Sequence, residues 1–393
     1  MDVSAARPLR FQSAHPDLDF LLGRVAEDIQ LSPTRYQKAV EHYEAVGGWL
    51  AAPDSQLAVF RPRVFAQGSM ALETTVSPWG RVEYDVDLVC EVTGGQWTAQ
   101  TLYDAVYTRL HDNGKFAPLL TPSEPCARLE YRGDFHLDII PAVRDLADMP
   151  RPWVAEYAAT GVLVPAPDLK EWSPSNPEGF IKWFKSRAVS VRRDWLLNAK
   201  LEPLPEQTEA EDKAPLAVAV QLLKRARDVA FNGKETAPLS VVLTTLAGQH
   251  YAGGESVTDI MEAVLHGIRG NIRAVGGGII RVLNPTNLAE NFADSMTKAG
   301  QDALDRFAKN VGAKLVELRE PGIGITHLKK EMEQLFGEDP VGVAAVDSAV
   351  RKLAELHKGR RDSGTLTYSP SVGLSVVGAP GTHHAPRNTN YGD

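Results

Sequence analysis

The stretch that decides the fold is "FAQGSMALETTVSPWGRVEYDVDLVCEV", residues 65–92. Its second part, "YDVDLVCEV", alternates in a way that predicts a strand with one apolar face. Asp85 and Asp87 are two residues apart, so both carboxylates project from the other face. Two like charges this close are unfavourable unless a cation lies between them. Carboxylate oxygens suit Mg²⁺ or Mn²⁺, so the stretch predicts a divalent metal site.

A third carboxylate follows in "ARLEYRGDFHLDIIPAV", residues 127–143. This segment predicts a hairpin with Gly133 and Asp134 at a two-residue turn. Asp138 lies on its outgoing strand, and pairing that strand beside the Asp-x-Asp strand would bring the three carboxylates together. Three carboxylates on neighbouring strands can hold two metal ions, which suits an in-line phosphoryl or nucleotidyl displacement. His136 shares the face of Asp138 and is expected to be a rim residue rather than a general base.

Gly68 and Ser69 precede the Asp-x-Asp strand. A glycine before a short helical turn lets backbone N–H groups approach a phosphate, and the serine hydroxyl adds a donor. Each part alone is a weak signal, because Gly-Ser turns are common and an Asp-x-Asp strand is more often an exposed edge. The order of the parts, from the turn to the Asp-x-Asp strand to the third aspartate, predicts a combined phosphate and metal site.

Bulk composition narrows the functional classes. The chain has 393 residues, 43% hydrophobic composition and a net charge of -8, which predicts about two lobes and no strong nucleic-acid binding. Cys90 and Cys126 lack a Cys-x-x-Cys or Cys/His neighbourhood, so neither zinc nor a disulfide is expected. No segment has the length of a signal-peptide core or a membrane span, and we expect a soluble cytoplasmic protein without membrane contact.

The remaining patterns indicate an α+β lobe followed by a helical lobe, with a central cleft between them. Residues 32–50 predict a helix capped by Ser32, and the next sixty or so residues predict strands and turns. Helices are predicted at 215–231, 238–251, 287–320 and 341–360, and an acidic loop at 198–215. We expect a catalytic lobe over 1–170, a helical lobe over 171–360 and a mobile tail over 361–393.

Three segments together, "QGSMALETTV", "EYDVDLV" and "FHLDIIP", resemble the nucleotidyltransferase superfamily of DNA polymerase beta. More closely, the chain resembles the bacterial cGAS/DncV-like nucleotidyltransferases (CD-NTases), the second-messenger synthetases of CBASS antiphage defence. The later segments "WSPSNPEGFIKWF", "VQLLKRARD", "PLSVVLTTLAGQHY" and "VLNPTNLAENFAD" are similar to the helical lobe of that family. The resemblance covers about residues 30–310. It implies a polymerase beta-like lobe, with a mixed sheet and flanking helices, joined to the helical lobe.

The resemblance also implies two sets of site residues. Arg225 and Arg227 stand beside Lys224 of the second set, and helical phase prevents all three side chains from facing one ligand. Many relatives carry an aromatic residue just after the Gly-Ser turn, where this chain has Met70, Ala71 and Leu72. The catalytic residues, which also bind two Mg²⁺ or Mn²⁺ ions, are Asp85, Asp87 and Asp138. The residues that contact the triphosphate are Gln67, Gly68, Ser69, Lys224 and Ser240.

The activity that the resemblance implies is synthesis of a cyclic oligonucleotide second messenger from ATP, GTP or both. A 2′- or 3′-hydroxyl of one NTP attacks the α-phosphate of another, and further transfer closes a purine-containing, cGAMP-like di- or trinucleotide ring. No organic cofactor is expected. A separate effector protein would respond to the product, and regulators from the same operon would act on the C-terminal tail. In some such operons a ubiquitin-like transfer system joins the C-terminus of the synthase to another molecule. A small last residue would suit that role, whereas this chain ends in Asp393.

Two other readings stay open at this point. Another polymerase beta-type enzyme would extend an RNA end or adenylylate a protein or small molecule, and an RNA-end enzyme would carry a basic groove. An inactive nucleotide-binding sensor would keep the fold but has no need of three metal ligands.

Overall fold

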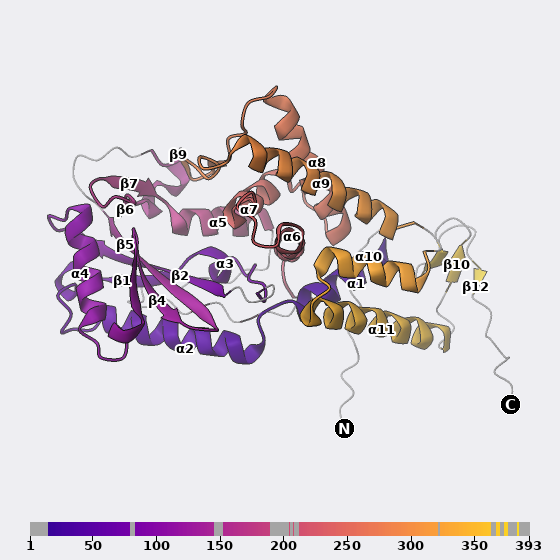
Figure 1. The fold of residues 1–393 in the computed structure, drawn as a ribbon, viewed down its shortest axis with the longest axis horizontal. Helices are drawn as coiled ribbons and strands as arrows, with labels where there is room; N and C mark the ends of the chain where they lie inside the picture. Colours follow the sequence, from indigo (N-terminus) through magenta and orange to yellow (C-terminus); the bar gives the residue numbers. More distant parts are fainter. Residues whose placement is uncertain are drawn as a thin grey trace.

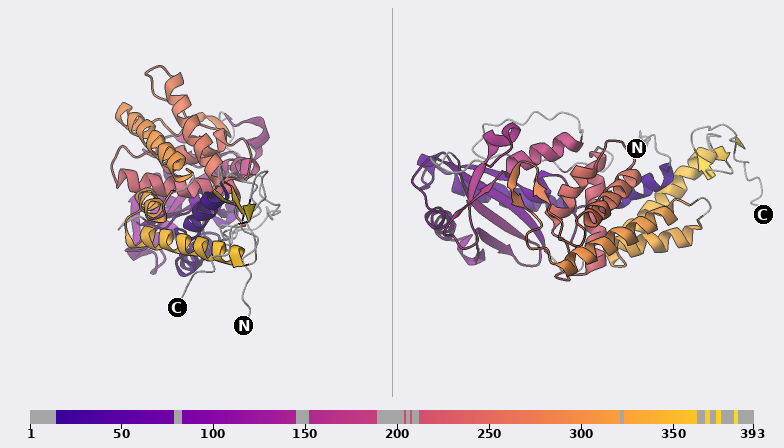
Figure 2. Two further views of the ribbon diagram at one scale, coloured as in Figure 1. Left: turned by 90° about the vertical axis from the view of Figure 1, so that its right-hand side faces the viewer. Right: turned by 90° about the horizontal axis from the view of Figure 1, so that it is seen from above.

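The computed structural model describes residues 15–78, 83–144, 152–188, 204, 207, 212–320, 323–362, 367–369, 373–375 and 383–384. The molecule is elongated, with a sheet at one end and packed helices at the other (Figures 1 and 2). Among the helices in these ranges, none is long and apolar enough to cross a membrane.

A seven-stranded sheet forms the first part, in the order β1-β2-β5-β4-β3, with β6 paired to β5 and β7 to β6. Strands β2 and β5 are parallel, and every other pair in this sheet is antiparallel. The sheet is therefore mixed, and the predicted α+β class is confirmed. The strands are β1 (Arg63–Ala66), β2 (Tyr84–Thr93), β3 (Leu120–Ser123), β4 (Cys126–Tyr131), β5 (Phe135–Arg144), β6 (Val162–Pro165) and β7 (Trp172–Ser175).

Two helices, α2 (Pro33–Leu50) and α4 (Ala99–His111), cover one face of this sheet. Their apolar side chains join the alternate residues of β2 and β5 in one buried cluster, which confirms the predicted apolar face. Helix α2 begins as predicted, because the Ser32 side chain accepts a hydrogen bond from the Arg35 amide. The opposite face of β2 and β5 is left to carry the aspartates.

Helices dominate the second part, around α6, whose residues from Leu216 to Ala226 are all buried. A helix that is buried nearly all round belongs in the centre of a bundle. The helices of this part are α1 (Pro16–Asp28), α5 (Pro177–Ala188), α6 (Pro215–Phe231), α7 (Ser240–His250), α8 (Val257–Ala274), α9 (Lys298–Leu318), α10 (Ile325–Phe336) and α11 (Pro340–Asp362). Short 3₁₀ turns lie at η1 (Ala58–Phe60), η2 (Ala117–Leu119) and η3 (Ala155–Thr160).

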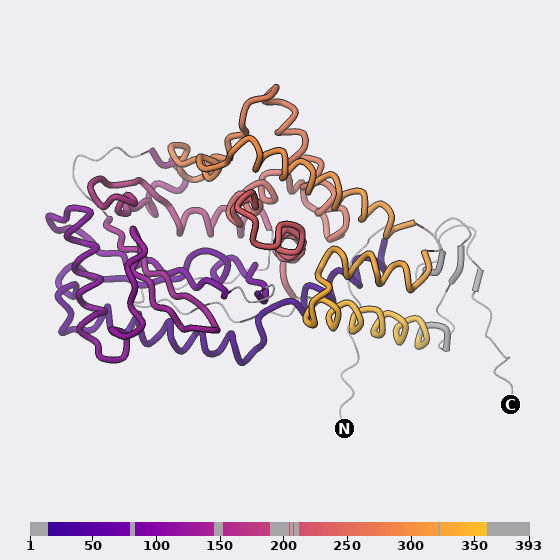
Figure 3. The backbone as a smooth tube through the Cα atoms, viewed as in Figure 1, coloured from indigo at the N-terminus to yellow at the C-terminus, as the bar shows by residue number. Residues whose placement is uncertain are grey.

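The first helix packs with the last ones. Leu21, Leu22 and Val25 of α1 are buried in the helical cluster, and α1 lies beside α11 (Figure 3). The chain then crosses to the sheet with α2 and returns to the helices at α5. The buried side chains form two main clusters, and α1 belongs to the helical one, so the division at residue 170 stays a prediction.

The prediction of a helix over 287–320 is wrong for about the first third of that range. A hairpin of β8 (Leu283–Asn284) and β9 (Asn287–Asn291) occupies that region, and α9 begins only at Lys298. Asn291 explains the difference, because its side-chain oxygen accepts from the amides of Val282 and Ala293 and so competes with a helix. Thr297 then caps α9 by accepting from the Gly300 amide.

Two further sequence expectations need correction. The segment after α2, predicted as strands and turns, contains α4, which Thr98 and Thr101 start with a reciprocal capping box. The β4–β5 hairpin closes through three residues, Arg132 to Asp134, rather than two, because Tyr131 pairs directly with Phe135. Gly133 has a φ of 80°, as a three-residue loop requires.

Two predicted irregular segments fall mostly outside the described residues. These are the acidic loop over 198–215, apart from its last residues, and the tail over 361–393. Within the tail the structure describes the strands β10 (Thr367–Ser369), β11 (Gly373–Ser375) and β12 (His383–His384).

Leu88 offers a test of the sheet core. It is fully buried on the apolar face of β2, so Leu88→Ala should lower the free energy of unfolding by about 2–5 kcal/mol. Urea unfolding followed by circular dichroism measures this. Val59→Ala is the control, because Val59 is 79% exposed and should change stability by less than about 0.5 kcal/mol. Equal effects for the two variants would contradict the assigned core.

Candidate active site

The three predicted aspartates meet on the face of the sheet that α2 and α4 leave uncovered. In the parallel register of β2 and β5, Asp87 lies directly opposite Asp138, and Asp85 lies opposite His136. Asp85 is the most exposed of the three, whereas Asp87 and Asp138 are half-buried. Because residues two apart share a face, the three carboxylates project to one side of two neighbouring strands.

The Gly-Ser turn packs directly against Asp87. Helix α3 (Gly68–Ala71) begins at this turn, and the Gln67 amide donates to the Asp87 carbonyl at 2.9 Å. Gly68 has a φ of 63°, and a Cβ added there would lie 2.2 Å from Asp87 Oδ2. Only glycine satisfies both the backbone conformation and this close approach. The Gly-Ser turn and Asp87 are thus one packed unit.

The carboxylates influence one another strongly. Burial, followed by the charges of Asp85 and Asp138, raises the pKa of Asp87 to about 7. The pKa of Asp85 is also raised, first by desolvation and then by Asp138. The site therefore holds more negative charge than it can stabilise by itself, and it favours a cation.

An arginine of the chain places one positive charge at these carboxylates. The sequence patterns did not indicate this residue as part of the site. Arg128 of β4 lies opposite Asp138 in the antiparallel register. Its Nε donates to Asp138 Oδ1 and its Nη2 to Oδ2, both at 2.7 Å. This bidentate hydrogen bonding raises the pKa of Arg128.

Lys224 approaches the same site from the helical part. It is 6% exposed, and its Nζ donates to the Thr74 carbonyl at 3.0 Å. Burial lowers its pKa to about 8, while Asp87 and Asp85 are near enough to oppose that shift. The predicted helical-lobe lysine is therefore brought to the aspartates.

The same side of α6 fixes the segment that follows α3. Gln221 Nε2 donates to the Thr75 carbonyl at 2.8 Å, and Arg225 Nη1 donates to the Ser77 carbonyl at 3.3 Å. Together with Lys224, these side chains bind three carbonyls of one extended segment. Arg225 is fully buried and also pairs with Asp339.

The other predicted phosphate contacts lie at the starts of two helices. Gln67, Gly68 and Ser69 are half-buried, and Ser69 Oγ accepts from Thr75 Oγ1 at 3.2 Å. Ser240 is the first residue of α7 and is half-buried. Arg227, one turn beyond Lys224, donates to the Pro238 carbonyl at 3.0 Å, which holds the start of α7 beside α6. Contact between Ser240 and a phosphate stays a prediction.

His136 lies near the start of β5 and is paired with Glu83. Its Nε2 lies 2.9 Å from Glu83 Oε2, and Glu83 Oε1 also accepts from the Gly133 amide at 2.6 Å. These contacts hold the imidazole near the start of β5, and its assignment as a rim residue rather than a general base stays a prediction.

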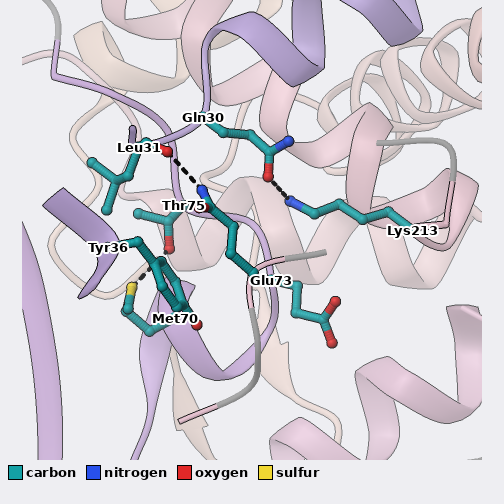
Figure 4. Close-up of a pocket in the computed structure, with 8 residues that line it drawn as sticks. Gln30, Leu31, Tyr36, Met70, Glu73, Thr75 and Lys213 are labelled. Atoms are coloured by element: carbon teal, nitrogen blue, oxygen red, sulfur yellow. Dashed lines mark hydrogen bonds between the residues drawn. The ribbon is translucent and has the colours of Figure 1, made fainter. Parts of the chain in front are cut away.

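A small cavity lies behind the Gly-Ser turn (Figure 4). Lys213 Nζ donates to Gln30 Oε1 at 2.5 Å, and Gln207 Nε2 donates to the Leu31 carbonyl at 2.6 Å. The cavity encloses about 20 Å³, which has room for about one water and not for a nucleotide. It is lined by Gln30, Leu31, Tyr36, Met70, Glu73, Thr75, Gln207 and Lys213.

The aspartate set fits a divalent cation in its chemistry. Two adjacent carboxylates with raised pKa values and a third on the next strand form an oxygen-rich donor set, which Mg²⁺ prefers. Within the described ranges no three His, Cys, Asp or Glu side chains are already gathered as ligands. Asp138 is turned toward Arg128 instead.

Comparisons with known proteins agree with this geometry. Residues 21–187 match the Second Messenger Oligonucleotide or Dinucleotide Synthetase (SMODS) domain. A c-di-GMP synthase of Roseivirga ehrenbergii is 30% identical over 389 residues, which cover 97% of this chain and 99% of the relative. The cyclic dinucleotide synthase CdnG of Bradyrhizobium diazoefficiens is 29% identical, over 92% of this chain and 89% of its own.

Solved structures show the same fold. The B. diazoefficiens CD-NTase CdnG in complex with GTP has a TM-score of 0.65 at 26% identity, covering 86% of this chain and 99% of that chain. Escherichia coli CdnC with ATP has a TM-score of 0.58 at 16% identity, covering 81% of this chain and 97% of that chain.

The fold and the site define a nucleotidyltransferase with a sheet lobe and a helical lobe. The chain belongs to the bacterial CD-NTases, the cGAS/DncV-like nucleotidyltransferases. It is an enzyme that makes cyclic oligonucleotides from NTPs, and the family implies a role in antiphage defence. The family is generally metal-dependent.

Gly68 tests the packing between turn and carboxylate. Gly68→Ala would place a methyl group against Asp87 Oδ2 and should reduce the turnover rate by about 100-fold or more, because small displacements at a reacting centre are costly. Product formation under saturating NTP measures the effect. Gly133→Ala is the matched control, since Gly133 also has a positive φ but a methyl group added there would meet nothing within 4 Å. Similar losses in both variants would contradict the packing argument.

Proposed function

We propose that this chain joins two purine NTPs, with GTP as the preferred substrate, into a cyclic dinucleotide. The observation that carries the proposal is the likeness over nearly the whole chain to a c-di-GMP synthase. The likeness to CdnG, whose structure contains GTP, supports the same base. A cGAMP-like mixed product remains the nearest alternative within this class.

Several residues would bind and orient the two nucleotides. The first turn of α3 leaves backbone N–H groups free for the triphosphate of the donor nucleotide, and Ser69 adds a hydroxyl. Lys224 and Ser240 would contact the same triphosphate from the helical side. Held in this way, the donor presents its α-phosphate toward the aspartates, where the acceptor hydroxyl attacks. Catalysis then rests on positioning and on charge neutralisation.

Asp85, Asp87 and Asp138 would hold two Mg²⁺ ions. When bound, such ions neutralise the triphosphate and make the attacking hydroxyl more acidic. The raised pKa values of Asp85 and Asp87 support the proposal, because a bound cation relieves the repulsion that causes them.

The proposed partners follow from the product. A cyclic dinucleotide released by this enzyme would activate a separate effector protein, and operon proteins would regulate the enzyme through its C-terminal tail. The chain would act in the cytoplasm, where NTPs are available.

The first experiment determines the product. Purified protein is incubated with all four NTPs and Mg²⁺ or Mn²⁺, treated with phosphatase, and analysed by mass spectrometry. We expect a phosphatase-resistant cyclic dinucleotide of guanine, absent with the Asp85→Asn, Asp87→Asn double variant. Linear or tailed products would indicate an RNA-end or group-transfer enzyme. Binding of NTP without any product, in protein with native circular dichroism, would favour the sensor reading.

Lys224 predicts a pH dependence of nucleotide binding. Its pKa is lowered to about 8, so it loses its charge as the pH rises through that value, and affinity for a non-hydrolysable GTP analogue should fall between about pH 7 and 9. Lys224→Gln should bind about tenfold more weakly at pH 7 and show a weaker pH dependence, since only the titration of the aspartates remains. Calorimetric titration measures both.

Lys213→Gln is the control for this measurement. The pKa of Lys213 is likewise lowered to about 8 by burial, but its Nζ faces Gln30 in the small cavity. This variant should keep the pH dependence. A Lys224→Gln protein with the same pH dependence as the native protein would rule out the assigned role.

A further inference from the structure

Asp138 lies between two residues of opposite charge on the neighbouring strands. On one side, in the parallel register, it faces Asp87 of β2, and on the other, in the antiparallel register, it faces Arg128 of β4. Both of its carboxylate oxygens accept hydrogen bonds from the Arg128 guanidinium at 2.7 Å. The pair is mostly shielded from solvent, with side-chain exposures of 13% for Asp138 and 30% for Arg128.

Arg128 also acts on the other two aspartates. Its positive charge lowers the pKa of both Asp85 and Asp87, against the larger raising effects of burial and like charge. The guanidinium is therefore within electrostatic range of the whole set. It partly neutralises the same carboxylates to which the divalent cations would bind.

A second arginine of the sheet shows what a purely structural pair looks like here. Arg144 of β5 makes an equally close bidentate contact with Glu91, at 2.7 and 2.8 Å. That pair is built into a larger network, because Glu91 also binds Arg63, and Arg144 approaches Glu178 of α5 at 3.6 Å. In the described part of the chain, the guanidinium of Arg128 has Asp138 as its one hydrogen-bonding carboxylate. Among the described residues, its hydrogen bonds therefore go to a carboxylate of the proposed metal set.

We propose that Arg128 is a positioning residue that competes with the divalent cation for Asp138, so that the ion gains its third carboxylate only when the Arg128–Asp138 pair opens. This inference rests on the proposed metal role of the three aspartates. The pair has two states. In the closed state Arg128 holds both oxygens of Asp138, and in the open state Asp138 turns toward Asp87. The apparent metal affinity is reduced by the fraction of molecules in the open state. Arg128 thereby sets the metal concentration at which the enzyme becomes active.

Direct metal binding tests the proposal. Mn²⁺ is titrated into the nucleotide-free protein, and the free ion is followed by electron paramagnetic resonance. Arg128→Gln removes both the competing hydrogen bonds and a positive charge, so it should bind Mn²⁺ at least about tenfold more tightly than the native protein. Arg128→Lys keeps the charge but loses the bidentate contact, and it should bind a few-fold more tightly. The half-saturating Mn²⁺ concentration for product formation should fall by the same factors.

Arg144→Gln is the matched control, because it removes the same bidentate geometry from the same sheet away from the aspartates. It should lower the melting temperature without changing Mn²⁺ affinity. Native or weaker Mn²⁺ affinity in Arg128→Gln, with native circular dichroism, would overturn the proposal. If Arg128→Gln does not fold, Arg128→Lys decides by the same criterion.

The double variant Asp85→Asn, Asp87→Asn separates this inference from the proposed metal site. If its Mn²⁺ binding equals that of the native protein, the proposed metal site is wrong, and the role of Arg128 falls with it. If its binding is lost but Arg128→Gln shows no gain, the metal site stands and only the competition is refuted.

Discussion

The parallel pairing of β2 with β5 is the constraint on which the rest of the site depends. Both strands bury alternate side chains against α2 and α4, and a slip of one residue would turn those side chains to the opposite face. The apolar face thus fixes the register. The register in turn fixes which carboxylates meet, and it places Asp87 directly opposite Asp138. The chemistry of one face is determined by the packing of the other.

That register brings three carboxylates together, and two other elements place positively charged side chains near them. Arg128 comes from the neighbouring strand and Lys224 from the central helix of the other part of the molecule. Lys224 also shares its helix face with Gln221, and both bind carbonyls of the segment that follows the Gly-Ser turn. The same helix therefore supplies a charge and fixes the distance between the two parts. Groups from two parts of a molecule that act on one ligand need such a fixed distance.

Comparison with relatives sets the class of reaction, whereas selection of the bases depends on local differences. The Gly-Ser turn is followed here by Met70, Ala71 and Leu72, none of which is aromatic. All three are buried, and Leu72 belongs to the helical cluster while Met70 and Ala71 belong to the sheet cluster. These residues join the two parts of the molecule and leave little side-chain surface for stacking on a base. Recognition of the nucleotide base must therefore involve residues from other elements.

The sequence by itself determined the features that depend on local pattern. Alternation predicted the faces of β2, and helical spacing predicted α2, α6 and α7. The Gly-Ser turn before an Asp-x-Asp strand predicted a site, and the structure places its turn and its aspartates together. The tertiary structure decided which residues lie opposite one another on neighbouring strands and which distant elements pack together. A two-residue turn would have paired Asp138 with Leu129, but the three-residue loop pairs it with Arg128, and that one-residue difference hid the arginine from the sequence analysis. The packing of α1 against α11 and the β8–β9 hairpin were likewise decided by distant contacts and side-chain hydrogen bonds. Such choices are not encoded in a local window, because their free energies come from residues far apart in the chain.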